Sequence, residues 1–168
     1  NRINQAFVDT IRAAGGNNAD RFLLIAGFGT DITNTCNDAY QMPTDTADDK
    51  LMLSVHYYDP SGYCIWNSIG SWGSKQDYTD MNEMLAKLTK FTDQGYGIVI
   101  GEWGVLEQQG GLREDTEEYY ENFLDNCDYY GFCPVLWDCN DVYNRLQCNI
   151  RYEELATILT AHSLANQS

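Results

Sequence analysis

The sequence predicts an α/β fold with a parallel sheet, because one structural unit recurs four times along the chain. In each repeat, a short apolar run is followed by a polar loop and then by apolar residues at helical spacing. The apolar runs are continuous rather than alternating, which is typical of parallel strands that are covered on both faces. A helix precedes the first strand, so the predicted order is one helix followed by four strand–helix units.

The amino-terminal helix is predicted over residues 3–14, where apolar residues at helical spacing stop at Gly15 and Gly16. The first strand is predicted over residues 22–27, a continuous apolar run. The helix after it has the weakest pattern of all, because residues 38–49 are polar and include Pro43.

The other three units follow the same pattern more clearly. Their strands are predicted at residues 51–55, 98–100 and 134–136. Their helices are predicted over residues 81–91 before Gly95, residues 119–127 before Gly131, and residues 152–159.

Length and charge limit the classes of protein that the chain can represent. With 168 residues and no low-complexity linker, residues 1–168 are expected to form a single domain. Ten basic residues against twenty-five acidic ones give a net charge of −15, which disfavours nucleic acid and anionic membranes as partners. No apolar run approaches membrane-spanning length, and residues 1–10 lack the pattern of a signal peptide.

The six cysteines show no spacing typical of a zinc site, so no metal is expected. Some disulfides, and therefore export from the cell, fit the cysteine content better. The pairing that we predict joins Cys139 to Cys148 across a short loop.

Polar and aromatic residues follow each of the last three predicted strands. Parallel strands end at the same edge of a sheet, so side chains at their carboxyl ends are expected to gather in one site. These strand ends carry His56-Tyr57-Tyr58, Glu102-Trp103 and Trp137-Asp138.

Three segments resemble the cellulases of glycoside hydrolase family 5, in the order and at the spacing of that family. The segment IVIGEWG (residues 98–104) resembles the family's seventh-strand motif, which contains the catalytic nucleophile. SVHYYDP (54–60) resembles the end of the sixth strand and VLWDCN (135–140) the end of the eighth. The resemblance covers essentially the whole chain and implies a parallel barrel of the TIM type, here only the carboxy-terminal half.

The resemblance assigns roles to the residues at these strand ends. Glu102 would attack the anomeric carbon of the sugar as the nucleophile of a retaining hydrolase. Tyr58 would hydrogen-bond the Glu102 carboxylate, and His56 would bind substrate hydroxyls or tune the neighbouring acid. Trp137 would stack against the sugar at the cleavage point. No metal or other cofactor is implied.

Further residues are predicted to bind substrate. Trp66 and Trp72 lie in the long loop after the sixth strand and are expected to form outer sugar subsites, although tryptophans in loops also fix loop structure. Trp103, directly after the nucleophile, is predicted to contact substrate as well. Asp138 and Asn140 are expected to contact sugar hydroxyls, with turn capping as the alternative role.

The sequence also departs from the family. It contains no Asn-Glu-Pro motif, so the acid/base glutamate that the resemblance implies is absent from this chain. A closed barrel of this type takes roughly 250 residues. Half a barrel leaves two open strand edges, so the chain is expected to pair with a missing first half or with a second copy of itself. In a homodimer, the partner's Asp138 would lie near the acid/base position.

The function expected from the resemblance is retaining hydrolysis of β-1,4-glucosidic bonds by a secreted endoglucanase acting on a β-glucan polysaccharide. The alternative is a non-catalytic or weakly active glucan-binding half-barrel that self-associates.

Overall fold

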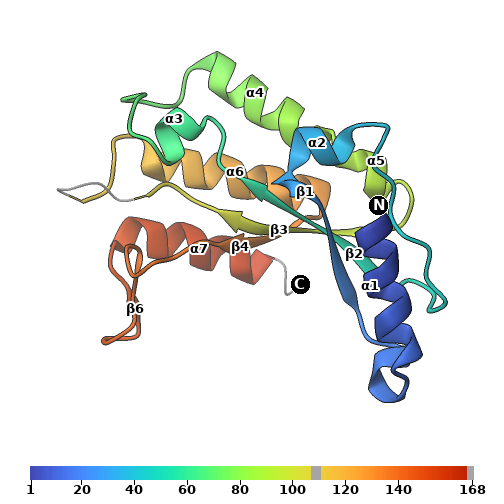
Figure 1. Ribbon diagram of the computed structural model, residues 1–168. Helices are drawn as coiled ribbons and strands as arrows, with labels where there is room; N and C mark the ends of the chain where they lie inside the picture. The colour runs from blue at the N-terminus through green and yellow to red at the C-terminus, as the bar shows by residue number, and fades with distance from the viewer. Residues whose placement is uncertain (107–110, 166–168) are drawn as a thin grey trace.

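The computed structural model describes residues 1–106 and 111–165 (Figure 1). One sheet contains four parallel strands in chain order, with β1 and β4 at its edges. The strands are β1 (Leu23–Asp31), β2 (Leu51–Tyr57), β3 (Gly97–Trp103) and β4 (Cys133–Leu136). The predicted parallel sheet is confirmed.

Helices follow the predicted order, with one exception. The long helices are α1 (Arg2–Ala13), α4 (Lys75–Ala86), α6 (Thr116–Tyr130) and α7 (Glu153–Ala165), and α5 (Thr89–Thr92) continues after α4. The prediction of a helix in residues 38–49 is wrong. The helix after β1 is the short α2 (Ile32–Cys36), capped by the Asp31 side chain, and the polar residues that follow it are not helical.

Short elements that the sequence did not predict complete the fold. They are the 3₁₀ helix η1 (Gly16–Ala19), the single turn α3 (Ser61–Cys64), and an antiparallel hairpin of β5 (Tyr143–Asn144) and β6 (Asn149–Ile150). Among the described residues, no helix combines the length and apolarity needed to cross a membrane.

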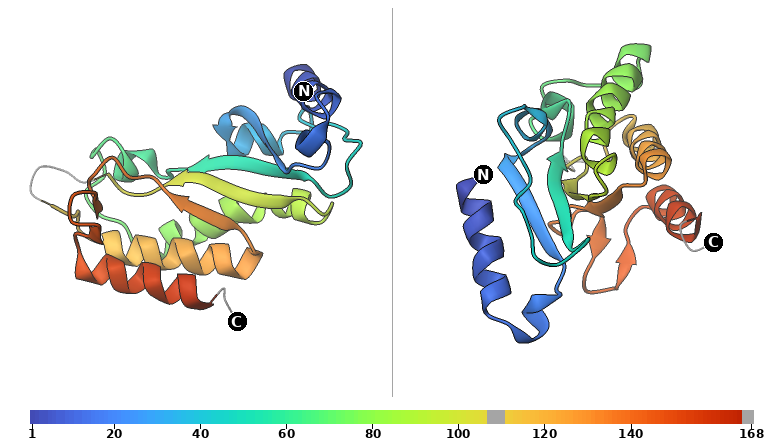
Figure 2. Two further views of the ribbon diagram at one scale, coloured as in Figure 1. Left: turned by 90° about the horizontal axis from the view of Figure 1, so that it is seen from below. Right: turned by 90° about the vertical axis from the view of Figure 1, so that its right-hand side faces the viewer.

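Helices cover one face of the sheet, where the main core lies. Figure 2 shows α1 along β1, and α4, α6 and α7 lie away from α1 and cover the remaining strands of the same face. Leu53, Val55 and Ile100 are fully buried on this face. Phe123 of α6 stacks on Tyr57 at 5.4 Å and on Trp103 at 4.3 Å between ring centroids, so α6 fixes the carboxyl ends of β2 and β3.

A paired arginine and aspartate attach α1 to the loop before β2. Arg12 donates from Nε and Nη2 to the two carboxylate oxygens of Asp45, at 2.7 and 2.6 Å. The two side chains are only 7% and 5% exposed. This fork geometry holds residues 38–49 against α1 without a helix of their own.

The opposite face of the sheet, which we call the open face, carries Leu24, Met52, Val99 and Val135. Leu24 and Val135 are each 47% exposed. Apolar side chains on an uncovered sheet face, together with unpaired strand edges, are typical of a surface that another segment covers.

The predicted disulfide between Cys139 and Cys148 is wrong, because all six cysteines are free thiols. Cys139 lies before β5, whereas Cys148 lies in the turn that leads into β6, and the two thiols contact different partners. Cys148 faces the Arg145 carbonyl across the turn, and the Cys139 thiol contacts the Asp141 carboxylate at 3.3 Å.

Replacing Phe123 with alanine is expected to lower the free energy of unfolding by about 3–5 kcal/mol, because a buried aromatic ring between two others leaves a cavity. Tyr129→Ala, on the same helix but 81% exposed, is the control and is expected to change it by under about 0.5 kcal/mol. Urea unfolding measures both, and equal losses would contradict the packing described here.

Candidate active site

An extra residue in β3 decides which face of the sheet Glu102 occupies. Val55 pairs with Ile100, but His56 pairs with Glu102, so Gly101 is inserted without a partner on β2. Before this bulge, Ile100 points to the helices; after it, Trp103 points to them and Glu102 joins His56 on the open face. A Cβ at Gly101 would lie 3.1 Å from the Ser54 hydroxyl oxygen, so glycine suits this close approach.

The structure brings together Glu102, Tyr58 and His56 from neighbouring strand ends. The Tyr58 hydroxyl donates a hydrogen bond to Oε2 of Glu102 at 3.2 Å. His56 Nδ1 lies 3.3 Å from the same oxygen. The Glu102 side chain is 31% exposed, so its carboxylate is held by two partners and still reachable from solvent.

Tyr58 is fixed as the donor in this group. Burial, followed by the negative charge of Glu102, raises the pKa of Tyr58 well above its ordinary value. The phenol therefore keeps its proton at neutral pH and acts as the hydrogen-bond donor to the Glu102 carboxylate.

The four tryptophans divide into two exposed and two buried residues. Trp66 is 72% exposed and Trp137 is 46% exposed, so both present a ring to solvent. Trp72 and Trp103 are only 4% and 1% exposed, and their predicted contacts with substrate are corrected. Trp72 packs against Tyr78 and Tyr119, and Trp103 stacks on Phe123, because both point toward the helices.

Asp138 is a loop cap. Its carboxylate accepts hydrogen bonds from the backbone N–H groups of residues 140–143, at 3.0 to 3.1 Å. Burial acts to raise the pKa of Asp138, but these four backbone donors outweigh it and hold the pKa below its ordinary value. An acid catalyst needs the opposite shift, so the partner's Asp138 is a poor replacement for the acid/base in a homodimer. Asn140 is exposed in this same loop, in a left-handed conformation at φ 76°.

Two residues beside the site were not singled out from the sequence. A cavity of about 230 Å³ adjoins His56 and Tyr58 and is also lined by Asp31 and Asp59. Burial, and then the charge of Asp31, raises the pKa of Asp59. Asp59 belongs to the SVHYYDP segment, but nothing in the sequence indicated that Asp31, four residues past the predicted strand, would lie near it.

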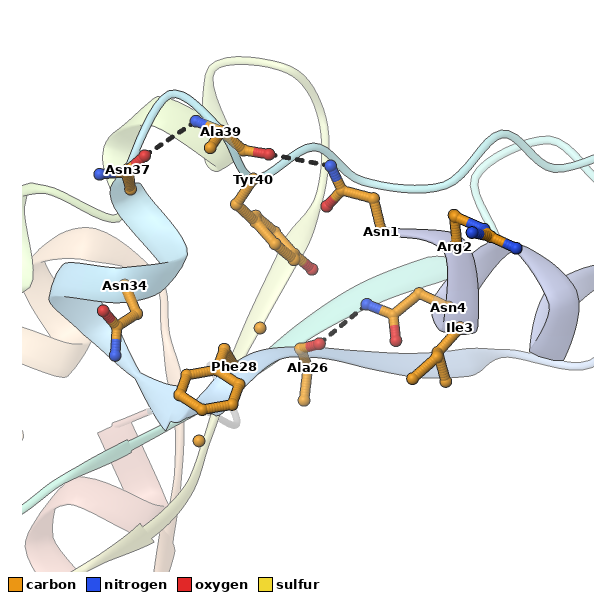
Figure 3. Close-up of a pocket in the computed structure, with 12 residues that line it drawn as sticks. Asn1, Arg2, Ile3, Asn4, Ala26, Phe28, Asn34, Asn37, Ala39 and Tyr40 are labelled. Atoms are coloured by element: carbon orange, nitrogen blue, oxygen red, sulfur yellow. Dashed lines mark hydrogen bonds between the residues drawn. The ribbon is translucent and has the colours of Figure 1, made fainter.

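A cavity larger than the one beside His56 lies away from Glu102, at the β1 edge of the sheet. It has a volume of about 820 Å³ between the start of α1, the end of β1 and α2 (Figure 3). Ile3 and Phe28 line it and are 84% and 85% exposed. This cavity therefore belongs to the uncovered edge of the sheet and holds none of the predicted catalytic residues.

Known proteins resemble this chain in sequence. A family model described as cellulase (glycosyl hydrolase family 5) matches residues 1–142. Endoglucanase B of Neocallimastix patriciarum is 30% identical over 139 residues, which cover 82% of this chain and 28% of that protein. Endoglucanase A of Paenibacillus barcinonensis is 30% identical over 164 residues, covering 82% of this chain and 41% of that protein.

Solved structures give the same result. A broad-specificity GH5-4 endoglucanase from an uncultured bovine rumen ciliate matches with a TM-score of 0.87 and 33% identity, over 96% of this chain and 53% of that one. A family 5 lichenase from Caldicellulosiruptor sp. F32 matches with a TM-score of 0.88 and 26% identity, over 97% and 48%. The chain therefore spans about half the length of the solved structures and less than half of these two endoglucanases.

Asp138→Ala is expected to lower the melting temperature at pH 7, because four backbone donors lose their acceptor. A carboxylate with a depressed folded pKa stabilises the fold above its unfolded pKa of about 3.9, and that contribution is lost as pH falls through the folded pKa. The gap between wild type and variant should therefore shrink as pH falls below about 4. Melting curves from pH 7 to pH 2 measure it, and a constant gap would contradict this role.

Proposed function

The chain belongs to glycosyl hydrolase family 5, and on that premise we propose that it carries the nucleophile side of a retaining endo-β-1,4-glucanase, with Glu102 as the nucleophile. The observation that carries the proposal is the place of Glu102 at the carboxyl end of an inner strand. There its carboxylate lies on the open face and is oriented by Tyr58 and His56.

The arrangement suits the first step of a double displacement. The Glu102 carboxylate attacks the anomeric carbon, the bond to the leaving oxygen breaks, and a second carboxyl group gives that oxygen a proton. In the second step, the same carboxyl group, now deprotonated, takes a proton from a water molecule. This water attacks the anomeric carbon and hydrolyses the glycosyl-enzyme ester. Tyr58 keeps one Glu102 oxygen in place by its hydrogen bond, which leaves the other oxygen available for attack.

The second carboxyl group is proposed to come from outside this chain. The sequence contains no Asn-Glu-Pro, and Asp138 is committed to its loop. A retaining enzyme needs the two carboxyl groups about 5 to 5.5 Å apart. We place the missing acid/base on an amino-terminal half that covers the open face, and we call the two halves together the complete barrel.

A β-glucan is the proposed substrate because the exposed aromatic rings suit the apolar faces of glucosyl units. Trp137 follows β4, and its backbone N–H donates to the Trp103 carbonyl at 2.9 Å, which fixes it one residue from Glu102 in the neighbouring strand. We propose that Trp137 stacks on the sugar next to the cleaved bond and that Trp66 binds a more distant unit.

Action outside the cell is part of the proposal, because a polymeric glucan does not enter cells. The cysteines give it no support, since all six are free thiols. Fractionation of cultures into cells and medium tests it, and enzyme confined to the cells would contradict it.

Incubating the complete barrel with 2,4-dinitrophenyl 2-deoxy-2-fluoro-β-cellobioside is expected to add one fluorocellobiosyl group to Glu102. The good leaving group needs little protonation, and the fluorine slows hydrolysis of the ester. Intact mass and peptide mapping detect the label. Glu102→Gln should remain unlabelled, and the control Glu83→Gln, at an exposed position of α4, should be labelled fully. Absence of label would favour a glucan-binding protein over this hydrolase. Label on another residue would contradict the assignment of Glu102 as the nucleophile.

By itself, the chain is expected to self-associate through the open face and to become a heterodimer when the amino-terminal half is added. Leu24→Ser or Val135→Ser should weaken self-association, because each removes apolar surface that association would bury. Leu146→Ser, at the 97% exposed tip of the hairpin, is the control and should not weaken it. Light scattering measures the mass of each, and a stable wild-type monomer in dilute solution would refute this part of the proposal.

A further inference from the structure

We propose that Arg113 is a positioning residue for glucan binding: it anchors the loop that presents Trp66 to the rim of the site. This inference rests on the proposed function, because it takes from it that the substrate is a β-glucan. Arg113 lies on the segment after β3, and it acts on the loop after β2. It therefore links β3, which carries Glu102, to the loop that begins with Tyr58 after β2.

The Trp66 loop is a small closed structure. It begins in α3, and the backbone N–H groups of Ser68 and Ile69 both donate to the Gly62 carbonyl, at 2.9 and 3.1 Å. Trp66 lies between these closing points, with its backbone N–H bonded to the Ser61 carbonyl at 3.0 Å and its side chain 72% exposed. The position of the Trp66 ring therefore depends on how the base of this loop is held.

Arg113 contacts the base of the loop in two ways. Its Nη2 donates to the Ile69 carbonyl, one of the residues that close the loop. Its guanidinium carbon lies 4.4 Å from the ring centroid of Tyr63, which is fully buried in α3. The planar guanidinium thus contacts the Ile69 carbonyl and the Tyr63 ring at once. A lysine ammonium is a compact point charge, and it would make only one of these contacts at a time.

Arg113 itself has a fixed support. Its carbonyl accepts a hydrogen bond from the Thr116 hydroxyl at 2.8 Å, at the start of α6. Neighbouring contacts join the same two segments: the Tyr63 hydroxyl donates to the Glu114 carbonyl, and the Trp72 backbone N–H donates to Asp115 at 3.0 Å. The described part of the segment after β3 therefore acts as a rigid support from which Arg113 reaches the loop.

A glucan long enough to reach Trp66 should detect the loss of this anchor, and a short substrate should not. In the complete barrel, Arg113→Ala is expected to raise KM for cellohexaose about fivefold with kcat nearly unchanged. The value of kcat/KM for 4-nitrophenyl β-cellobioside, which occupies only sugar positions next to Glu102, should stay within about twofold. Arg113→Lys should recover part of the loss, and Arg21→Ala, which removes the same charge from an exposed position, should have no effect.

The double variant Arg113→Ala/Trp66→Ala decides whether Arg113 acts through Trp66. If it does, removing Arg113 has no further effect once Trp66 is absent, so the two changes are not additive. Multiplicative effects, or equal losses on the long and short substrates, would overturn the inference.

Calorimetric affinity for cellohexaose separates this inference from the proposed function, because binding needs no acid/base. Hydrolysis by wild type without dependence on Arg113 overturns the inference alone. Absence of hydrolysis together with cellohexaose binding that weakens about fivefold in Arg113→Ala overturns the catalytic proposal and supports the role of Arg113.

Discussion

The extra residue at Gly101 is the constraint on which the rest of the site depends. Strand side chains alternate between faces, so without the bulge Glu102 would share the helix-covered face with Ile98 and Ile100. With it, Glu102 pairs with His56 and reaches Tyr58, while Trp103 takes the buried position against Phe123. One inserted glycine therefore fixes both the exposed carboxylate and the aromatic packing that holds its strand.

The two faces of the sheet have different roles, and the open face serves both association with another segment and the proposed catalysis. The helix-covered face holds the core and sets the strand register. The open face carries the Glu102 group and also the exposed Leu24 and Val135. A segment that covers the open face would remove apolar surface from water and would bring new side chains to Glu102. The proposed acid/base and the need for a covering half thus follow from the same uncovered surface.

Much of the fold could be predicted from the sequence, because continuous apolar runs and glycine-terminated helices report local structure directly. The motif positions also indicated which strand ends would meet. What failed depends on orientation in space. The positions of Trp72 and Trp103 in the sequence suggested contact with substrate, but both side chains point toward the helices and are buried. The contacts of Asp138 and Cys139 depend on the path of the chain around the β5–β6 hairpin, and the hydrogen bond of Arg113 to Ile69 joins residues 44 positions apart. Sequence periodicity carries no information about such contacts.

A crystal structure of the complete barrel with Glu102→Gln and cellotetraose bound tests the central claim most directly. We expect a side-chain atom of residue 102 to lie about 3 to 3.5 Å from one anomeric carbon, on the face opposite the leaving oxygen, with Tyr58 still in contact. A glucan bound elsewhere, or with residue 102 directed away from every anomeric carbon, would contradict it.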